Sequence, residues 1–177
     1  MTRRAVRTGR RRGTLWRIRL YRAVPPWPEL LLGTLGWAGL TAASSLLSVW
    51  RLGWTLPQAF MQVAFLFAVG SAIAWPLAAI AIRLTARSLP PGAAYALAFL
   101  VLATTTIGVT SGFYALWYRD YYADWHATVF TTEWAFQFAF TVGGAVYQFL
   151  VLGLPMYMPV GFAGLFAASF LLARTTR

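Results

Sequence analysis

The 177-residue sequence contains no cysteine, no lysine, one histidine and only four acidic residues. Without cysteine the chain can form no disulfide bond, no thiolate metal site and no thiol nucleophile. A single histidine excludes a haem held by two histidines of this chain. The sequence also lacks a phosphate-binding loop, a dinucleotide-binding glycine motif and the Gly-x-Ser-x-Gly motif of serine hydrolases. We therefore expect a protein that is not an enzyme and that holds no metal or cofactor.

Charged residues of both signs are scarce, and apolar residues fill their place. Charged residues make up 11% of the chain and hydrophobic residues 59%, whereas a soluble domain carries roughly a quarter charged residues. This composition is typical of an integral membrane protein. We predict an all-α bundle of four to five transmembrane helices, which crosses a bacterial inner membrane several times.

The basic residues, all of them arginine, are concentrated at the N-terminus. Nine of the fifteen lie in the first 22 positions. We predict that residues 1–28 form a disordered tail and proline linker on the cytoplasmic side, attracted to anionic lipid headgroups by about 1 kcal/mol per basic residue. The alternative is a nucleic-acid-binding arm, which we disfavour because only Trp16 and Tyr21 interrupt the basic run with aromatic rings.

The rest of the chain, residues 29–174, divides into apolar runs that are separated by turns rich in proline, glycine and arginine. A run of about 20 residues is needed to cross a hydrocarbon core of about 30 Å. We predict helices over residues 30–50, 58–82, 93–117, 133–152 and 157–173.

The number of crossings depends on the last two runs, which the segment from Gly153 to Pro159 interrupts. Two full crossings there would make five in all and would place the C-terminus opposite the N-terminus. One crossing with an interfacial or re-entrant segment would make four and would place both termini on one side. The hydropathy of these runs favours five, which we prefer, and Arg174 and Arg177 favour four through the positive-inside bias.

Small residues recur at helical spacing in three of the predicted helices. Such residues let helix backbones approach closely in a membrane. We expect them to pack against other helices of this chain, of a second copy or of a membrane-protein partner. The residues are Gly33, Gly36, Gly39, Gly70, Ala74, Gly108 and Gly112.

The loop after the third predicted helix interleaves charged and aromatic residues. It contains Asp120, Asp124 and His126 among tyrosines and tryptophans. Carboxylate and imidazole groups can hold a divalent metal, but the loop has no paired-histidine spacing. An aromatic belt at the membrane interface explains the pattern more simply.

The fourth predicted helix carries a regular stripe of polar residues. Glu133, Gln137, Thr141, Gly144 and Gln148 fall on one face of a helix with 3.6 residues per turn. Because amides in hydrocarbon need partners, we expect the stripe to face the helix at 93–117, or Gln58 and Gln62 of the helix at 58–82. The stripe is either a ligand site or path or a set of interhelical contacts of about 0.6 kcal/mol each.

These patterns favour a non-catalytic accessory, assembly or sensor-input subunit that packs against a membrane partner. The alternative is a transporter subunit or small carrier that uses the stripe of Glu133, Gln137, Thr141 and Gln148. A carboxylate-based intramembrane enzyme using Asp120, Asp124 or Glu133 is a third and weaker hypothesis.

Overall fold

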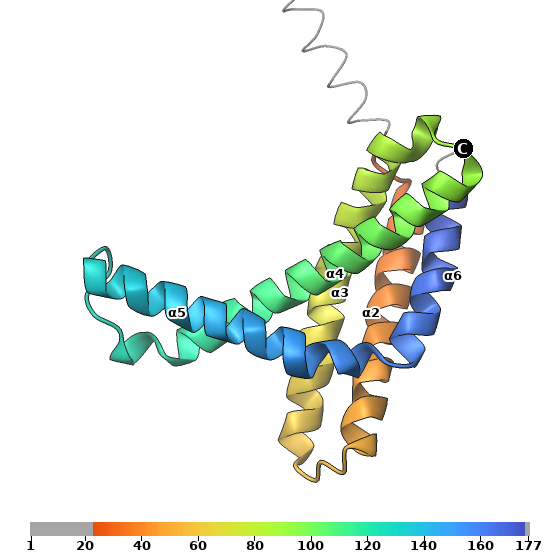
Figure 1. The fold of residues 1–177 in the computed structure, drawn as a ribbon. Helices are drawn as coiled ribbons and strands as arrows, with labels where there is room; N and C mark the ends of the chain where they lie inside the picture. Colours follow the sequence, from red (N-terminus) through yellow and green to blue (C-terminus); the bar gives the residue numbers. More distant parts are fainter. Residues whose placement is uncertain (1–22, 176–177) are drawn as a thin grey trace, which may run out of the picture.

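The computed structural model describes residues 23–175, so the prediction of a basic tail falls mostly outside the described residues. The described chain is all-helical (Figure 1), which confirms the predicted fold class. Its main helices are α2 (Trp27–Arg51), α3 (Pro57–Thr85), α4 (Pro91–Tyr121), α5 (Thr132–Gln148) and α6 (Val160–Arg174). Four helical stretches of the described chain are long and apolar enough to cross a membrane, and α6, with 15 residues, is a shorter fifth.

Proline, glycine and threonine residues mark several helix starts and turns. Pro57 and Pro91 lie in the first turns of α3 and α4, where the missing amide proton costs nothing. The turn between α2 and α3 includes Gly53 at a φ of +70°, a backbone angle that glycine adopts without strain. Thr131 caps α5, since its hydroxyl accepts a hydrogen bond of 3.2 Å from the amide of Trp134.

The core lies between α2, α3, α4 and α6 and is built largely from small side chains. Ala78 of α3 and Ala98 of α4 are fully buried, and they pack in one cluster with Leu102, Leu165 and Leu172. Because lipid tails are as apolar as leucine, close van der Waals contact drives helix association in a membrane. Alanine at these positions allows that close approach.

The helix α5 departs from this bundle. The second half of α4, the 3₁₀ turn Ala123–Trp125 and α5 project to one side of α2 and α3 (Figure 1). We call residues 113–148 the arm. Within α5, all of which belongs to the described chain, Ala145 is the one buried residue.

A break in the helix connects the arm to α6. After Gln148 the chain forms a π turn, Phe149–Gly153, and a 3₁₀ turn, Leu154–Tyr157, before α6 begins at Val160. We call residues 149–159 the junction. The chain stays helical from α5 through Tyr157 and leaves helical geometry at Met158, inside the interruption predicted from Gly153 to Pro159.

The last helix runs back toward the end of the bundle at which α2 begins. Leu171 and Thr175 line the same cavity as Pro25 and Glu29, and Figure 1 shows that α6 ends at the end of the bundle where α2 begins. Five full crossings would place these two ends on opposite sides. The two ends lie together, as four crossings would place them, and the four long apolar stretches with the shorter α6 fall within the predicted range of four to five helices.

Candidate functional site

The polar stripe of α5 faces α4 and the loop of the arm. The hydroxyl of Tyr114 donates a 3.0 Å hydrogen bond to the side-chain oxygen of Gln148. The side-chain oxygen of Gln137 accepts a 2.7 Å hydrogen bond from the main-chain amide of Ala127. Thr141 Oγ1 lies 3.2 Å from His126 Nε2. Three stripe residues are thus used to hold α5 against the other half of the arm.

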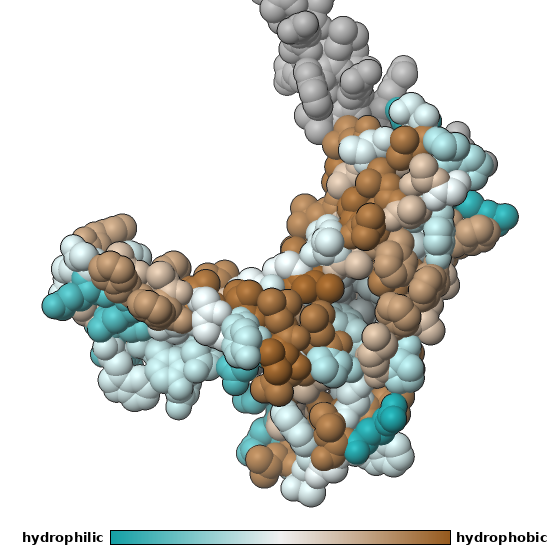
Figure 2. Space-filling view, in the orientation of Figure 1, coloured by the Kyte–Doolittle hydropathy of each residue, from teal (hydrophilic) through white to brown (hydrophobic). Residues whose placement is uncertain are grey.

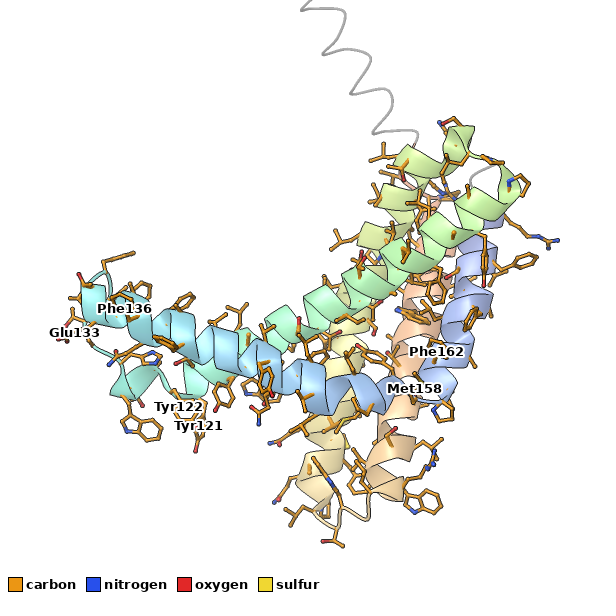
Figure 3. The ribbon with its side chains drawn as sticks, in the orientation of Figure 1. Tyr121, Tyr122, Glu133, Phe136, Met158 and Phe162 are labelled. Carbon is orange, nitrogen blue, oxygen red and sulfur yellow. The ribbon has the colours of Figure 1, made fainter. Side chains whose placement is uncertain are left out.

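The acidic residues of the arm lie on its surface. Glu133 is exposed at the far end of the arm (Figure 3), and Asp120 and Asp124 are exposed on the α4 side of the loop. Within residues 23–175, no three histidine, aspartate or glutamate side chains come close enough to hold a metal ion together. The loop candidates therefore do not form one cluster, and His126 alone of them contacts the stripe.

An open cavity of about 390 Å³ lies between the loop and α5, lined mainly by aromatic side chains. The ring centroids of Tyr118 and Tyr122 are 4.8 Å apart, and those of Tyr122 and Trp125 are 5.4 Å apart. A hydrogen bond with Tyr118, with further repulsion between the two phenolates, raises the pKa of Tyr122 above its ordinary value of 10. The raised pKa favours the neutral form of the Tyr122 phenol.

The junction is held by hydroxyl groups of α2. Ser44 donates to the main-chain oxygen of Met156 at 3.2 Å and accepts a hydrogen bond of 3.0 Å from the amide of Gly161. The hydroxyl of Ser48 lies 3.3 Å from the oxygen of Met156 and 3.0 Å from that of Met158. Irregular backbone is tolerated within a membrane only where such groups satisfy it, so the two serines make the break in the helix possible.

Sequence reasoning missed these serines, although a signal for them was present. The spacing of Thr41, Ser44 and Ser48 places three hydroxyls on one face of α2, and all three residues are buried. Hydroxyl residues at positions i, i+3 and i+7 of an apolar helix are the sequence signal that indicates a polar partner.

Further polar contacts connect the helices inside the bundle. The indole nitrogen of Trp37 in α2 donates a 3.0 Å hydrogen bond to Thr106 Oγ1 in α4. The hydroxyl of Tyr157 in the junction donates a 3.1 Å hydrogen bond to Thr110 Oγ1, also in α4. Each contact satisfies a polar group that would otherwise be unpaired in hydrocarbon.

The small residues singled out from the sequence divide into two groups. Gly33 lies against the ring of Trp75, Gly70 lies against Thr110, and Ala74 is fully buried. At the other four, an added Cβ would meet no atom of another helix of the described chain within 4 Å. These four are Gly36, Gly39, Gly108 and Gly112.

A second cavity, of about 520 Å³, lies at the end of the bundle where α2 begins and α6 ends. Its lining is mostly apolar and includes Gly33 and Trp75. At its rim Arg83 forms an ion pair of 2.6 Å with Glu29. The Arg83 side chain is 14% exposed and that of Glu29 is 51% exposed. Water therefore solvates the charge of Arg83 less than that of Glu29, and the ion pair matters more to the arginine.

Comparison with known proteins gives no match of any kind: no protein-family model fits the sequence, and neither a curated protein nor a solved structure is similar to the chain.

Proposed function

We propose that this protein is a small non-catalytic subunit of a complex in a bacterial inner membrane and that it holds a partner membrane helix against the outer face of α4. The observation that supports this proposal is the outward-facing stripe Thr104, Gly108 and Gly112. A Cβ added at Gly108 or at Gly112 would meet no atom of another helix of the described chain within 4 Å. The stripe is therefore not used for packing within the chain.

The contrast with α3 makes this stripe informative. In α3 the similar stripe of Gly70, Ala74 and Ala78 is buried, and Gly70 contacts Thr110 directly. Glycine in a helix costs about 1 kcal/mol relative to alanine, a cost that the contact offsets in α3. In α4 nothing within the described chain offsets it. A helix of another molecule packed at close range would do so.

The experiment is co-purification of the full-length protein from its native membranes in mild detergent. We expect a membrane protein to be retained by the wild type and lost from Gly108→Leu and Gly112→Leu. Ala163→Leu, which enlarges an exposed small residue of α6, serves as the matched control and should retain the partner. Equal retention by the wild type and both glycine variants would refute the proposal, provided that all variants elute as folded species in size-exclusion chromatography.

A transport subunit is a second candidate, and the junction is the feature that favours it. Broken helices with main-chain oxygens at membrane depth are the parts from which secondary transporters build substrate and ion sites. If an uptake activity is lost when this protein is deleted, this candidate predicts that Gln137→Leu and Glu133→Gln abolish uptake while the protein still inserts. Unchanged uptake in both variants would count against it.

A further inference from the structure

We propose that the arm lies along the surface of the membrane, on the side of the α2–α3 turn, and that α5 is an interfacial helix held by lipid rather than a membrane-crossing one. The partner of this surface is the bilayer interface itself, where headgroups meet acyl chains. This inference does not depend on the proposed function, because the stripe of α4 lies outside the arm.

The direction of α5 is the first observation. In Figure 1, the axes of α2, α3 and α6 lie roughly parallel to one another, whereas the axis of α5 runs crosswise to them and away from the bundle. A membrane normal that suits the three bundle helices therefore places α5 close to the membrane plane. The stretch Thr132–Tyr157 is long and apolar enough to cross, but length and composition do not decide direction.

The distribution of side chains over the arm is the second observation. Figure 2 shows that hydrophobic residues cover the side of the arm nearer the start of α2, and hydrophilic ones the opposite side. Phe136 lies on the first side, and Tyr121 and Tyr122 lie on the second (Figure 3). Phe136 and Phe140 are 62% and 78% exposed. An apolar face toward the bilayer centre and a polar face toward water is the arrangement of an interfacial amphipathic helix.

The charged and aromatic residues of the arm fit the same depth. Asp120, Asp124 and Glu133 are exposed, and carboxylates are strongly disfavoured in hydrocarbon unless they are enclosed by protein. Tyrosine and tryptophan, by contrast, settle at the level of the headgroups. Tyr121 and Trp125, which are 69% and 68% exposed, therefore belong at the interface together with the nearby carboxylates.

The tip of the arm supplies an independent observation. Phe130 has a φ of 71° and is 91% exposed, next to Val129, which is 51% exposed. A non-glycine residue in this region of backbone space is strained, and here the strain presents a large apolar ring outward. Insertion of the Phe130 ring among acyl chains would offset the cost of this strain, whereas exposure of the ring to water would not.

The absence of cysteine from the whole sequence allows a direct test with single-cysteine variants of the full chain. Phe136→Cys, Phe140→Cys and Tyr147→Cys place a bimane label along the outer face of α5. Met61→Cys, Phe65→Cys and Ile73→Cys do the same on α3, where all three residues are exposed. Each variant is reconstituted in vesicles of phosphatidylethanolamine and phosphatidylglycerol that carry a nitroxide quencher at a defined depth on the acyl chain.

The two orientations of α5 give different depth profiles. A crossing helix changes depth by about 16 Å over the 11 residues from 136 to 147, since each residue rises 1.5 Å. We expect instead one shared depth near the headgroups for all three α5 labels, and a steady change of depth along α3. A gradient on α5 that matches the gradient on α3 would overturn the proposal. Labels on α5 that no lipid quencher reaches, while those on α3 are quenched, would also overturn it, because protein would then cover this face.

Discussion

The hydroxyl of Ser48 in α2 donates a hydrogen bond of 3.0 Å to the main-chain oxygen of Met158, which lies 110 residues later in the junction. With Ser44, it satisfies the main-chain groups that are freed where α5 gives way to α6. The junction therefore needs the hydroxyls of α2 as hydrogen-bond partners, and these buried hydroxyls in turn need the main-chain groups of the junction.

Ser44→Ala and Ser48→Ala should each destabilise the protein by about 1–2 kcal/mol, because a buried carbonyl or amide loses its partner. Thermal unfolding in detergent measures the loss. Ser45→Ala is the matched control: Ser45 is equally buried, but it donates only to Ala42 of its own helix, at 2.8 Å. If Ser45→Ala destabilises the protein as much as Ser44→Ala, the contacts with the junction are not what stabilises it.

Gly70→Ala should weaken the contact between α3 and α4. A Cβ at position 70 would lie 2.8 Å from the Cα of Thr110, and overpacking of this kind costs about 1–3 kcal/mol, more than the gain in helix propensity of about 1 kcal/mol. Gly39→Ala, whose Cβ would meet nothing within 4 Å, should be neutral or stabilising in the same unfolding measurement. The reverse order of the two variants would contradict the packing described for α3.

The hydrogen bond between Tyr114 and Gln148 should be detectable as a coupling energy. In a double-mutant cycle of Tyr114→Phe and Gln148→Leu we expect about 0.6 kcal/mol, and no more than about 1.7 kcal/mol, the range measured for interhelical hydrogen bonds in membranes. Tyr114→Phe combined with Gln137→Leu should be additive, since Gln137 bonds to Ala127 instead. A coupling near zero for the first pair would show that the stripe does not hold α5 through this contact.

The ion pair of Glu29 and Arg83 should contribute a salt-dependent stability. Glu29→Gln removes the charge that faces an arginine with only 14% of its side chain exposed. Because Glu29 itself is half exposed, we expect a loss of about 0.5–1 kcal/mol at low salt and a smaller loss at high salt. Glu133→Gln, at the exposed tip of the arm, should change stability at neither salt concentration. An effect of Glu29→Gln that is independent of salt would assign the loss to packing rather than to charge.

The sequence was sufficient for the helical class and for most helix starts. Proline in the first turn of α3 and of α4 and the threonine cap of α5 act locally, so the pattern of residues determines them. The direction of α5 is different. It follows from contacts between α2 and the junction that are more than a hundred residues apart in the chain, and hydropathy carries no information about them.

The sequence predicts that the polar residues of α5 share one face of the helix, but it does not predict which groups they bond to. Helical periodicity places Gln137, Thr141 and Gln148 on one side. Which groups meet them depends on the path of the loop, since Gln137 bonds to the main-chain amide of Ala127 and Thr141 meets His126. A main-chain donor in a loop has no sequence signature, so this part of the site required the structure.

The place of α6 beside α2 and α4 has a consequence for how the protein is made. Helices α2, α3 and α4 pack in the order of their synthesis, so the ribosome can deliver them as successive hairpins that assemble as they leave the translocon. The hydroxyls of Ser44 and Ser48 and the alanine face of α4 gain their partners only after the junction and α6 have been translated, because α6 packs against both α2 and α4. The contacts of α2 with the junction therefore join segments more than a hundred residues apart and can form only later than those between α2, α3 and α4.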